Sequence, residues 1–491
     1  MSPNQLLLSG ITILPLAGVM VLLIWRRASK REAAVVGIIS EGFALAIPIM
    51  LLGTLRSEGA IRFTLPWIPD MGISLSLELS WLALIFLLTE VLVTLAAMIY
   101  SLGEAKGEKN SNYYYALLLL FSLGMSGTTL ADDIFLFFIF WELMLIASVL
   151  LIIVWGDGEK RHRIGLKYFI LTHIGSLMVL VCLVMMYVNF GTASLTTLMD
   201  EAKLLPMNIQ VFMTAFFLIG FCVKMAIFPL HIWLPDAHTV APMPVTIILA
   251  AAMLSMGAFG VLRFPFSLFP LENLQPFAIW MMIGGLVSEV YGALMALAEK
   301  DIKRIIAYSS VSQVGYILFG LGTLTLRGMQ GAILHVVYHA IVKALLFMAV
   351  GIIIAVTRER QIDRVGGLGK KLPLLTACTA IGILGISGMP PLGIFNSEWM
   401  IFAGGFDSGV SIALTVITLI GSVLTLVYGL RFFGKIFFGP KKPATLAARS
   451  PRALLFPTIA VTLFLLFEGL APASLMDWAL RGLAGILGGG L

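Results

Sequence analysis

Residues 216–238 read FFLIGFCVKMAIFPLHIWLPDAH, an apolar run that contains one lysine, Lys224, and two prolines, Pro229 and Pro235. A run of about 20 apolar residues is long enough to cross a lipid bilayer. A proline removes a backbone hydrogen bond and breaks a helix locally. At membrane depth, broken backbone is tolerated only where it is buried in protein or lines a wet cavity. This stretch therefore predicts an interrupted membrane-spanning helix with a charged side chain beside the break.

The composition of the whole chain also indicates that it lies in a lipid bilayer. The 491 residues are 59% hydrophobic and 12% charged, whereas a soluble domain carries about 25% charged residues. Mean hydropathy is +1.01. These values exclude a disordered, collagen-like or nucleic-acid-binding chain, and the short alternating strands of a porin-like barrel are absent. The chain is therefore predicted to be an integral membrane protein.

Apolar stretches divide the chain into about 14 predicted spans, so we expect an all-α integral membrane fold. The start of the chain lacks the basic region and cleavage site of a signal peptide and is interpreted as the first span. The twelfth span is interrupted, like the seventh, by the Gly-Pro-rich segment 388–393. The spans fall at 6–25, 34–55, 79–100, 113–129, 133–155, 168–189, 210–230, 243–262, 274–297, 305–323, 328–356, 373–405, 410–430 and 454–472.

The basic residues predict the orientation of the chain. Loops after odd-numbered spans hold 24 Lys and Arg, and loops on the opposite side hold 6. Short loops rich in Lys and Arg stay in the cytoplasm. Both termini are therefore expected on the non-cytoplasmic side, and the net charge of +6 is a signal of orientation rather than of an acidic partner.

The two interrupted spans indicate an internal symmetry. They are five spans apart, and an odd-numbered repeat must be inverted in the membrane. Transporters built from inverted repeats bind their ions near the midplane, at broken helices. The predicted repeats are residues 113–264 (spans 4–8) and 265–436 (spans 9–13), flanked by residues 1–112 (spans 1–3) and 437–491 (span 14 and tail).

Ionisable side chains inside the spans are the candidate functional residues. Each costs at least about 2.5–3.5 kcal/mol to insert, so its presence calls for a reason. His173 and His231 are placed less deeply than the others. The deeper candidates are Glu41, Glu90, Glu142, Lys224, Glu289, His335, His339, Lys343 and Glu398.

Glu142 and Lys224 are the first candidate pair. Burial disfavours the charged form of a carboxyl and of an amine alike, and pairing restores both charges. A Glu–Lys pair that opens and closes would act as a proton switch. The alternative is a static buried ion pair that holds two helices together.

His335, His339 and Lys343 are spaced four residues apart and share one stripe of a helix. Histidine titrates near neutral pH and can relay protons. A hydrogen-bonded helix contact is the alternative, and a metal site is disfavoured because no HExxH motif or further ligand is present. Glu398 follows the break at 388–393, where it can exchange protons or cap the half-helix through the helix dipole.

The remaining acids have simpler interpretations. Glu41 and Glu90 lie on spans 2 and 3 and are expected to be helix-contact or subunit-interface residues. Glu289 is expected to extend towards the cytoplasmic surface. Asp132 and Asp133 precede span 5 and are predicted to cap its N-terminus.

No cofactor or metal is expected in this chain. It contains no P-loop, no GxGxxG and no nucleophile elbow with partners, so no nucleotide, flavin or haem site is indicated. The three cysteines, Cys182, Cys222 and Cys378, lie far apart in apolar segments with no CxxC. Zinc, iron–sulfur and disulfide chemistry are therefore disfavoured.

Five strings carry a resemblance to a known family: FFIFWELMLIASVLLI (137–152), WLPDAH (233–238), KDIKRIIAYSS (300–310), GAILHVVYHAIVKALLFMAVG (331–351) and SGMPPLGIFNSEWMIFAG (387–404). They resemble the antiporter-like subunits shared by respiratory complex I, Mrp-type Na⁺/H⁺ antiporters and energy-converting membrane hydrogenases or sulfur reductases. The similarity covers about residues 80–430, and the subunit-D and subunit-M members are the most similar in length.

The resemblance implies a fold and a set of roles. The fold is 14 helices in two inverted five-helix repeats, with helices 7 and 12 broken. Glu142 would pair with Lys224, and Glu398 would form the far exit for protons. His335, His339 and Lys343 match the family's span-11 residues, with His173, His231 and Ser255 as auxiliary candidates.

One departure from the family pattern concerns span 8. The family's span-8 lysine stands in a string similar to LLKMGAYG, but here the string is LSMGAFG and the position is Ser255. Ala250 stands where some members have histidine. Serine holds no charge at neutral pH, although it can order a water.

The leading hypothesis is therefore a proton-translocating subunit, with Na⁺/H⁺ exchange left open, of a multi-subunit membrane complex. Its partners would be antiporter-like and small membrane subunits, the cations and the lipid bilayer, without nucleic acid. Redox energy would come from the partners, because this chain is expected to hold no catalytic centre. The alternative is a transporter-derived adaptor whose conduction is impaired at Ser255. A stand-alone substrate transporter or a quinone-reactive enzyme is less well supported.

Overall fold

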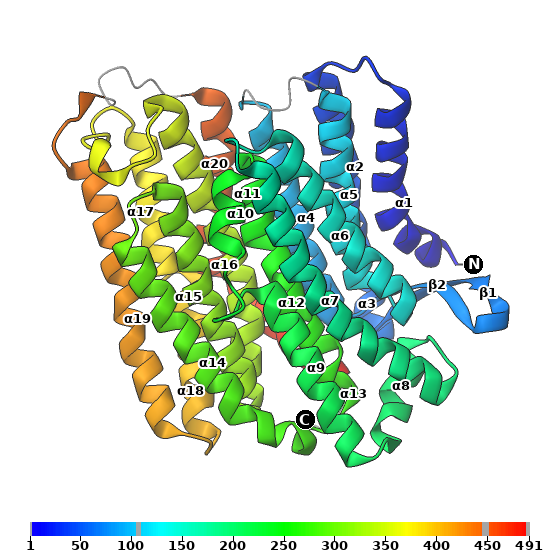
Figure 1. The fold of residues 1–491 in the computed structure, drawn as a ribbon. Helices are drawn as coiled ribbons and strands as arrows, with labels where there is room; N and C mark the ends of the chain where they lie inside the picture. Colours follow the sequence, from blue (N-terminus) through cyan, green and yellow to red (C-terminus); the bar gives the residue numbers. More distant parts are fainter. Residues whose placement is uncertain (1, 105–109, 444–450, 488–491) are drawn as a thin grey trace.

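The computed structural model describes residues 2–104, 110–443 and 451–487, and it is a bundle of long helices (Figure 1). In this part of the chain, thirteen helices are long and apolar enough to cross a membrane. A further crossing is divided between two shorter helices, α17 (Pro373–Ile386) and α18 (Gly393–Asp407). The predicted all-α membrane fold is confirmed, and the interruption of span 12 falls where the Gly-Pro segment predicted it.

The other helices and strands follow one another in this order: α1 (Pro3–Ile24), α2 (Lys30–Met50), α3 (Leu52–Glu58), β1 (Ile61–Ile68), β2 (Ile73–Leu79), α4 (Trp81–Ser101), α5 (Ser111–Leu130), α6 (Ile134–Trp155), α7 (Arg161–Phe190), α8 (Leu195–Glu201), α9 (Met207–Met225), α10 (Leu234–Val240), α11 (Met243–Ile248), α12 (Leu254–Arg263), α13 (Pro265–Leu268), α14 (Leu271–Ala298), α15 (Ile302–Gly322), α16 (Leu326–Thr357), α19 (Ile412–Phe433), α20 (Arg452–Leu470) and α21 (Ala473–Ile486).

Span 7 is broken between α9 and α10, as the prolines predicted. Ala226 ends α9 in the left-handed region, with φ of 59°. The exposed backbone of the break finds side-chain partners: the Phe228 N–H donates to Ser288 Oγ at 2.7 Å. The indole N–H of Trp233 donates to the Val223 carbonyl at 3.0 Å. Buried backbone groups thus remain satisfied where the helix hydrogen bonds stop.

The break in span 12 brings a glycine against an acid. Gly388 has φ of +63°, a conformation that favours glycine. A Cβ built on Gly388 would collide with the Glu398 carboxyl. The loop between α17 and α18 therefore lies so close to Glu398 that only glycine fits at position 388.

Span 8 contains a distortion that the sequence did not predict. Between α11 and α12, residues Leu249–Met253 form a turn of π-helix, η3. Such wide turns are rare and occur frequently at functional sites. This turn is completely buried and packs against α4 and α16.

The start of α6 confirms one of the two predicted caps. Asp133 Oδ1 accepts hydrogen bonds from the Phe135 and Leu136 N–H groups at 2.9 and 3.1 Å. Asp132 instead accepts from Thr196 Oγ1 at 2.8 Å and pairs with Arg263 at 3.4 Å. The prediction that Asp132 caps this helix is wrong, because its carboxyl turns towards α8 and the end of span 8.

Arg263 also connects the β1–β2 hairpin to the bundle. Its guanidinium lies 3.9 Å from Glu78, which Arg62 contacts at 2.8 Å. Burial acts to raise the pKa of Glu78, but Arg263 and Arg62 outweigh it and hold that pKa below its usual range. For Asp132, burial and the neighbouring Glu78 charge raise the pKa. This hairpin, α8 and α21 are elements that the search for spans did not predict.

Candidate functional site

Lys224 lies in the last turn of α9, directly before the break in span 7. It is 2% exposed, and its ammonium has no hydrogen-bond partner among the residues that the structure describes. The ammonium lies over the ring of Trp141, 5.3 Å from the centroid. A cation–π contact of this kind stabilises a desolvated ammonium by about 2 kcal/mol. Lys224 is therefore held as a buried amine that can change partners.

Glu142, the acid expected to pair with Lys224, contacts a histidine instead. Its Oε2 lies 3.0 Å from His173 Nδ1, and its Oε1 has no hydrogen-bond partner. The side chains of Glu142 and His173 are 16% and 35% exposed, so this pair lies towards the surface of the chain. The Glu142 charge still acts on Lys224, although among the described residues no ion pair joins them. The expected direct pair is thus separated in this structure.

His231 occupies the turn between α9 and α10. It is 3% exposed and lies against the rings of Phe228 and Tyr291, with centroid separations of 5.5 and 4.8 Å. Its Nδ1 has no hydrogen-bond partner. This auxiliary candidate is therefore a buried, partly unsatisfied imidazole beside the break.

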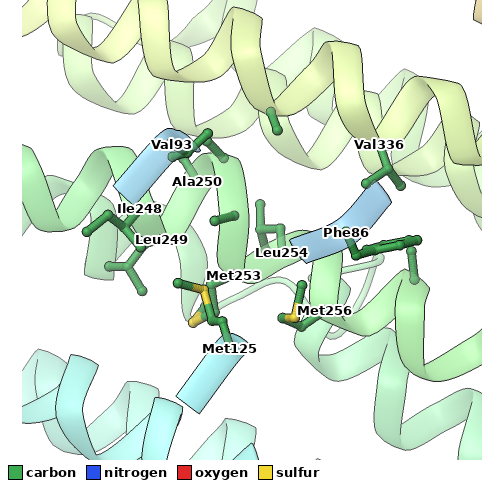
Figure 2. Close-up of a cluster of buried hydrophobic side chains, with 14 of the residues drawn as sticks. Phe86, Val93, Met125, Ile248, Leu249, Ala250, Met253, Leu254, Met256 and Val336 are labelled. Carbon is green, nitrogen blue, oxygen red and sulfur yellow. The ribbon is translucent and has the colours of Figure 1, made fainter. Parts of the chain in front are cut away.

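Span 8, where Ser255 stands, is apolar at its centre. The Ser255 hydroxyl donates to the Ala251 carbonyl of its own helix at 3.1 Å. Figure 2 shows the buried side chains that gather around this segment from α11, η3, α12, α4, α5 and α16. They include Phe86, Val93, Ile248, Leu249, Ala250, Met253, Leu254, Met256, Met125 and Val336.

The span-11 residues are brought together on α16. His335, His339 and Lys343 are at most 1% exposed. The two imidazole rings are nearly parallel, with centroids 6.5 Å apart. Lys343 Nζ donates to the Ile306 carbonyl at 3.1 Å and to Ser309 Oγ. The predicted stripe therefore exists as a row of buried groups, two of which, His335 and His339, have an Nε2 without a partner.

At the far end of this row, His335 connects to the second broken helix. Its Nδ1 lies 3.0 Å from Ser397 Oγ on α18. Ser397 precedes Glu398, which is 7% exposed and has an Oε1 without a partner. Ser397 is a contact that sequence reasoning missed, although it lies in the quoted span-12 string.

Glu289 is a second acid at this end. The prediction that it extends to the surface is wrong, because it is 0% exposed and its Oε1 accepts from the Tyr316 hydroxyl at 2.9 Å. The Glu398 charge acts on it. Gly421 of α19 makes room for its carboxyl, since a Cβ there would collide with it. The position of Glu289 along its span could not predict this burial, because burial depends on which helices pack beside it.

His238, in the WLPDAH string, is a buried group that the sequence reading did not select. It is 0% exposed, neither ring nitrogen has a partner, and the charges of Lys303 and Lys343 both act on it. Lys303 lines a cavity of about 420 Å³ together with Tyr100, Asp157, Arg358 and Arg360. The His238 ring also packs against that of Phe347 on α16, with centroids 5.6 Å apart.

Broken helices, buried amines and buried acids in one helical bundle define a class: antiporter-like membrane subunits. Residues 131–425 match the family described as NADH:quinone oxidoreductase/Mrp antiporter, transmembrane. The chain belongs to this family.

Curated relatives agree with this assignment. The chain is 33% identical to NADH-quinone oxidoreductase subunit M of Escherichia coli (strain K12), covering 90% of both chains. It is also 33% identical to NAD(P)H-quinone oxidoreductase chain 4 2 of Thermosynechococcus vestitus, covering 82% of this chain and 77% of that one.

Solved structures share the fold. A chain of the membrane-bound sulfane sulfur reductase, an archaeal respiratory membrane complex, is 29% identical with a TM-score of 0.86, over 95% of this chain and 76% of that one. A chain of the Mrp complex from Dietzia sp. DQ12-45-1b is 21% identical with a TM-score of 0.87, over 99% and 98%. The latter similarity concerns the fold alone.

Proposed function

We propose that this chain is a proton-translocating, antiporter-like subunit of a multi-subunit membrane oxidoreductase or antiporter complex. The observation that carries the proposal is the series of buried ionisable groups at the two broken helices and on α16. Within residues 2–104, 110–443 and 451–487, Lys224 has no hydrogen-bond partner, and Glu142, His335, His339 and Glu398 each retain an unpartnered polar atom. A structural ion-pair network would satisfy these atoms, whereas a proton carrier needs groups that can change partners.

The positions of these groups support a different role for each of them. Glu142, bonded to His173 near the surface of the chain, can receive or transmit charge to a neighbouring subunit. Its approach to Lys224 or retreat towards His173 would change the proton affinity of the lysine. Lys343 and the two histidines of α16 would carry protons within the chain, and Glu398 with Glu289 would release them.

The relatives of the chain support its being one subunit of a larger complex. Named relatives are subunits of quinone oxidoreductases, and one structural relative belongs to a sulfur reductase complex. We expect energy from partner subunits, a position in the inner membrane, both termini on the non-cytoplasmic side, and two inverted repeats at 113–264 and 265–436. The polar cavity beside Lys303 would then open from the cytoplasmic side. Lys106, Lys109 and Arg449, which contribute to the orientation count, lie outside the described residues.

A second candidate function is an adaptor subunit that no longer conducts. The apolar surroundings of Ser255 favour it, because nothing on span 8 near that residue can hold a proton. A Ser255→Lys variant and a Lys224→Met variant separate the two functions. If neither changes transport, the chain acts as a scaffold.

The direct test is proton transport by the host complex in liposomes that contain a pH-sensitive dye. Glu142→Gln is expected to lower the rate by about tenfold or more, because a positioned proton carrier contributes at least that much. Lys203→Met, an exposed lysine, is the control and should transport normally. Unchanged transport by the Glu142→Gln complex would contradict the proposal.

A further inference from the structure

Two buried acids take no part in the path described above. Glu41 on α2 and Glu90 on α4 are 0% and 1% exposed. The two helices pack against each other, and the Glu41 charge acts on Glu90. They do not lie on a surface that could meet another subunit, so of the two roles predicted for them only contact inside the chain remains. Placing two acids inside membrane-spanning helices costs free energy, so their presence indicates a function.

Hydroxyl groups of α5 face both acids. Ser122 faces Glu41, and Ser126 and Thr129 face Glu90. These three residues are spaced four and three apart, so they form one stripe of the helix. The Thr129 hydroxyl lies 3.4 Å from Glu90 Oε2 and 3.7 Å from the sulfur of Met256.

Most of the polar atoms in this group have no partner. Both oxygens of Glu41, Oε1 of Glu90 and the Ser122 hydroxyl are buried and unsatisfied. Ser122 is itself 1% exposed and lies opposite Glu41, so a buried donor and a buried acceptor face each other with room for a proton between them. Among the described residues, no Lys, Arg or His lies within ion-pair distance of either carboxyl. A carboxyl without a counter-ion in such surroundings takes up a proton and becomes neutral.

The pair lies beside the apolar segment of span 8. Helix α4, which carries Glu90, packs against the π-turn η3. Phe86 and Val93, one turn before and after Glu90, belong to the apolar cluster of Figure 2. Met256, which Thr129 contacts, directly follows Ser255. The acids are therefore adjacent to the position that lacks an ionisable group.

We propose that Glu41 and Glu90 form a proton-binding carboxyl pair that serves the middle of the chain in place of an ionisable residue on span 8. The ligand is a proton: the O–H bond of one carboxylic acid breaks as an O–H bond forms on its neighbour, with the Ser and Thr hydroxyls as intermediates. No oxidant or other reactant is needed. This inference rests on the proposed function, since an adaptor would have no use for such a pair.

Infrared difference spectroscopy of the whole complex in lipid tests whether protons occupy the pair. The wild-type minus Glu90→Gln spectrum is expected to contain the carbonyl stretch of a protonated carboxylic acid, and this band should shift in D₂O. The same holds for Glu41→Gln. Absence of the band from both difference spectra would overturn the proposal. Loss of the wild-type band on adding NaCl at constant pH would also overturn it, because a sodium ion would then be the ligand.

Transport by the same variants tests whether the pair is used. Glu90→Gln is expected to lower proton transport in liposomes at least fivefold, Glu90→Asp should retain more than Gln, and Ser255→Lys should restore transport to Glu90→Gln. Glu58→Gln, an exposed acid on α3, is the matched control. Normal transport by Glu90→Gln overturns this inference alone if Glu142→Gln has lost transport. If Glu142→Gln also transports normally, the proposed function fails as well.

Discussion

Span 8 (Met243–Leu268) and α16 are two buried helical segments that pack against each other, yet their chemistry is opposite. Helix α16 carries two histidines and a lysine on one stripe. Span 8 carries no ionisable side chain except Arg263, which lies near its end and pairs with Asp132 and Glu78. Burial in the centre of the bundle therefore does not itself create a proton path. The path requires polar groups whose partners can change.

The backbones of the two segments also differ. Helix α16 is regular, so a spacing of four residues keeps its ionisable groups in one row. The π-turn in span 8 shifts the register by one residue, and the residues on either side of Ser255, Leu254 and Met256, are apolar. The Ser255 hydroxyl donates to the Ala251 carbonyl of its own helix, and the acids proposed to serve this region lie on α2 and α4.

The largest effect is expected on α16. Lys343→Met removes the amine that donates to Ile306 O and Ser309, and proton transport should fall about tenfold or more. The measurement is dye-monitored transport by the host complex in liposomes. Lys435→Met, a surface lysine, is the control. Full transport by Lys343→Met would remove the functional difference between α16 and span 8.

The next largest effect is expected where α12 of span 8 packs closely against α9, the helix that carries Lys224. A Cβ on Gly257 would collide with the Met225 side chain and lie 2.7 Å from the Phe221 carbonyl. Gly257→Ala should therefore separate α12 from α9 and destabilise the chain by about 1–3 kcal/mol, with weaker transport. Thermal unfolding in detergent measures this.

Gly53→Ala is the matched control for that substitution. A Cβ on Gly53 meets no atom within 4 Å, and alanine is the better helix former by about 1 kcal/mol. Its stability should therefore be unchanged or slightly higher. Equal melting temperatures for Gly257→Ala and wild type would show that this close contact of span 8 is unimportant.

A smaller effect is expected from removing the Ser255 hydroxyl. Ser255→Ala loses one hydrogen bond to the backbone, worth about 0.5–1.5 kcal/mol. Transport should remain within about twofold of wild type, because the hydroxyl does not carry a proton. Dye-monitored proton transport by the host complex in liposomes measures this. A tenfold loss would show that Ser255 orders a water and that span 8 conducts.

The smallest effect is expected for an ion pair in water, which gives a baseline for charges outside the spans. The hydrogen bond from Lys435 holds the pKa of Asp363 below its usual value. A carboxyl whose pKa is lowered in the folded state stabilises the fold at pH values above its unfolded pKa of about 3.9. This contribution is lost as the pH falls through the pKa of the folded state. Because both side chains are about half exposed, Asp363→Asn should cost less than about 0.5 kcal/mol. Melting temperatures between pH 3 and pH 7 would reveal any larger dependence.

Sequence reasoning succeeded where the signal is local. The breaks at spans 7 and 12 follow from prolines and glycines, and the row on α16 follows from helical spacing alone. The separation of Glu142 from Lys224 and the burial of Glu289 and His238 depend on which helices become neighbours. The π-turn in span 8 also has no sequence signature of its own, since Leu249–Met253 is apolar like the rest of the span.

If protons cross the membrane through the buried groups of this chain while partner subunits supply the energy, removing one buried amine must change the number of protons translocated per turnover. This number can be measured for the host complex carrying Lys224→Met. We expect it to fall while the partner subunits continue to turn over. A value equal to that of the wild-type complex would contradict transport through these groups.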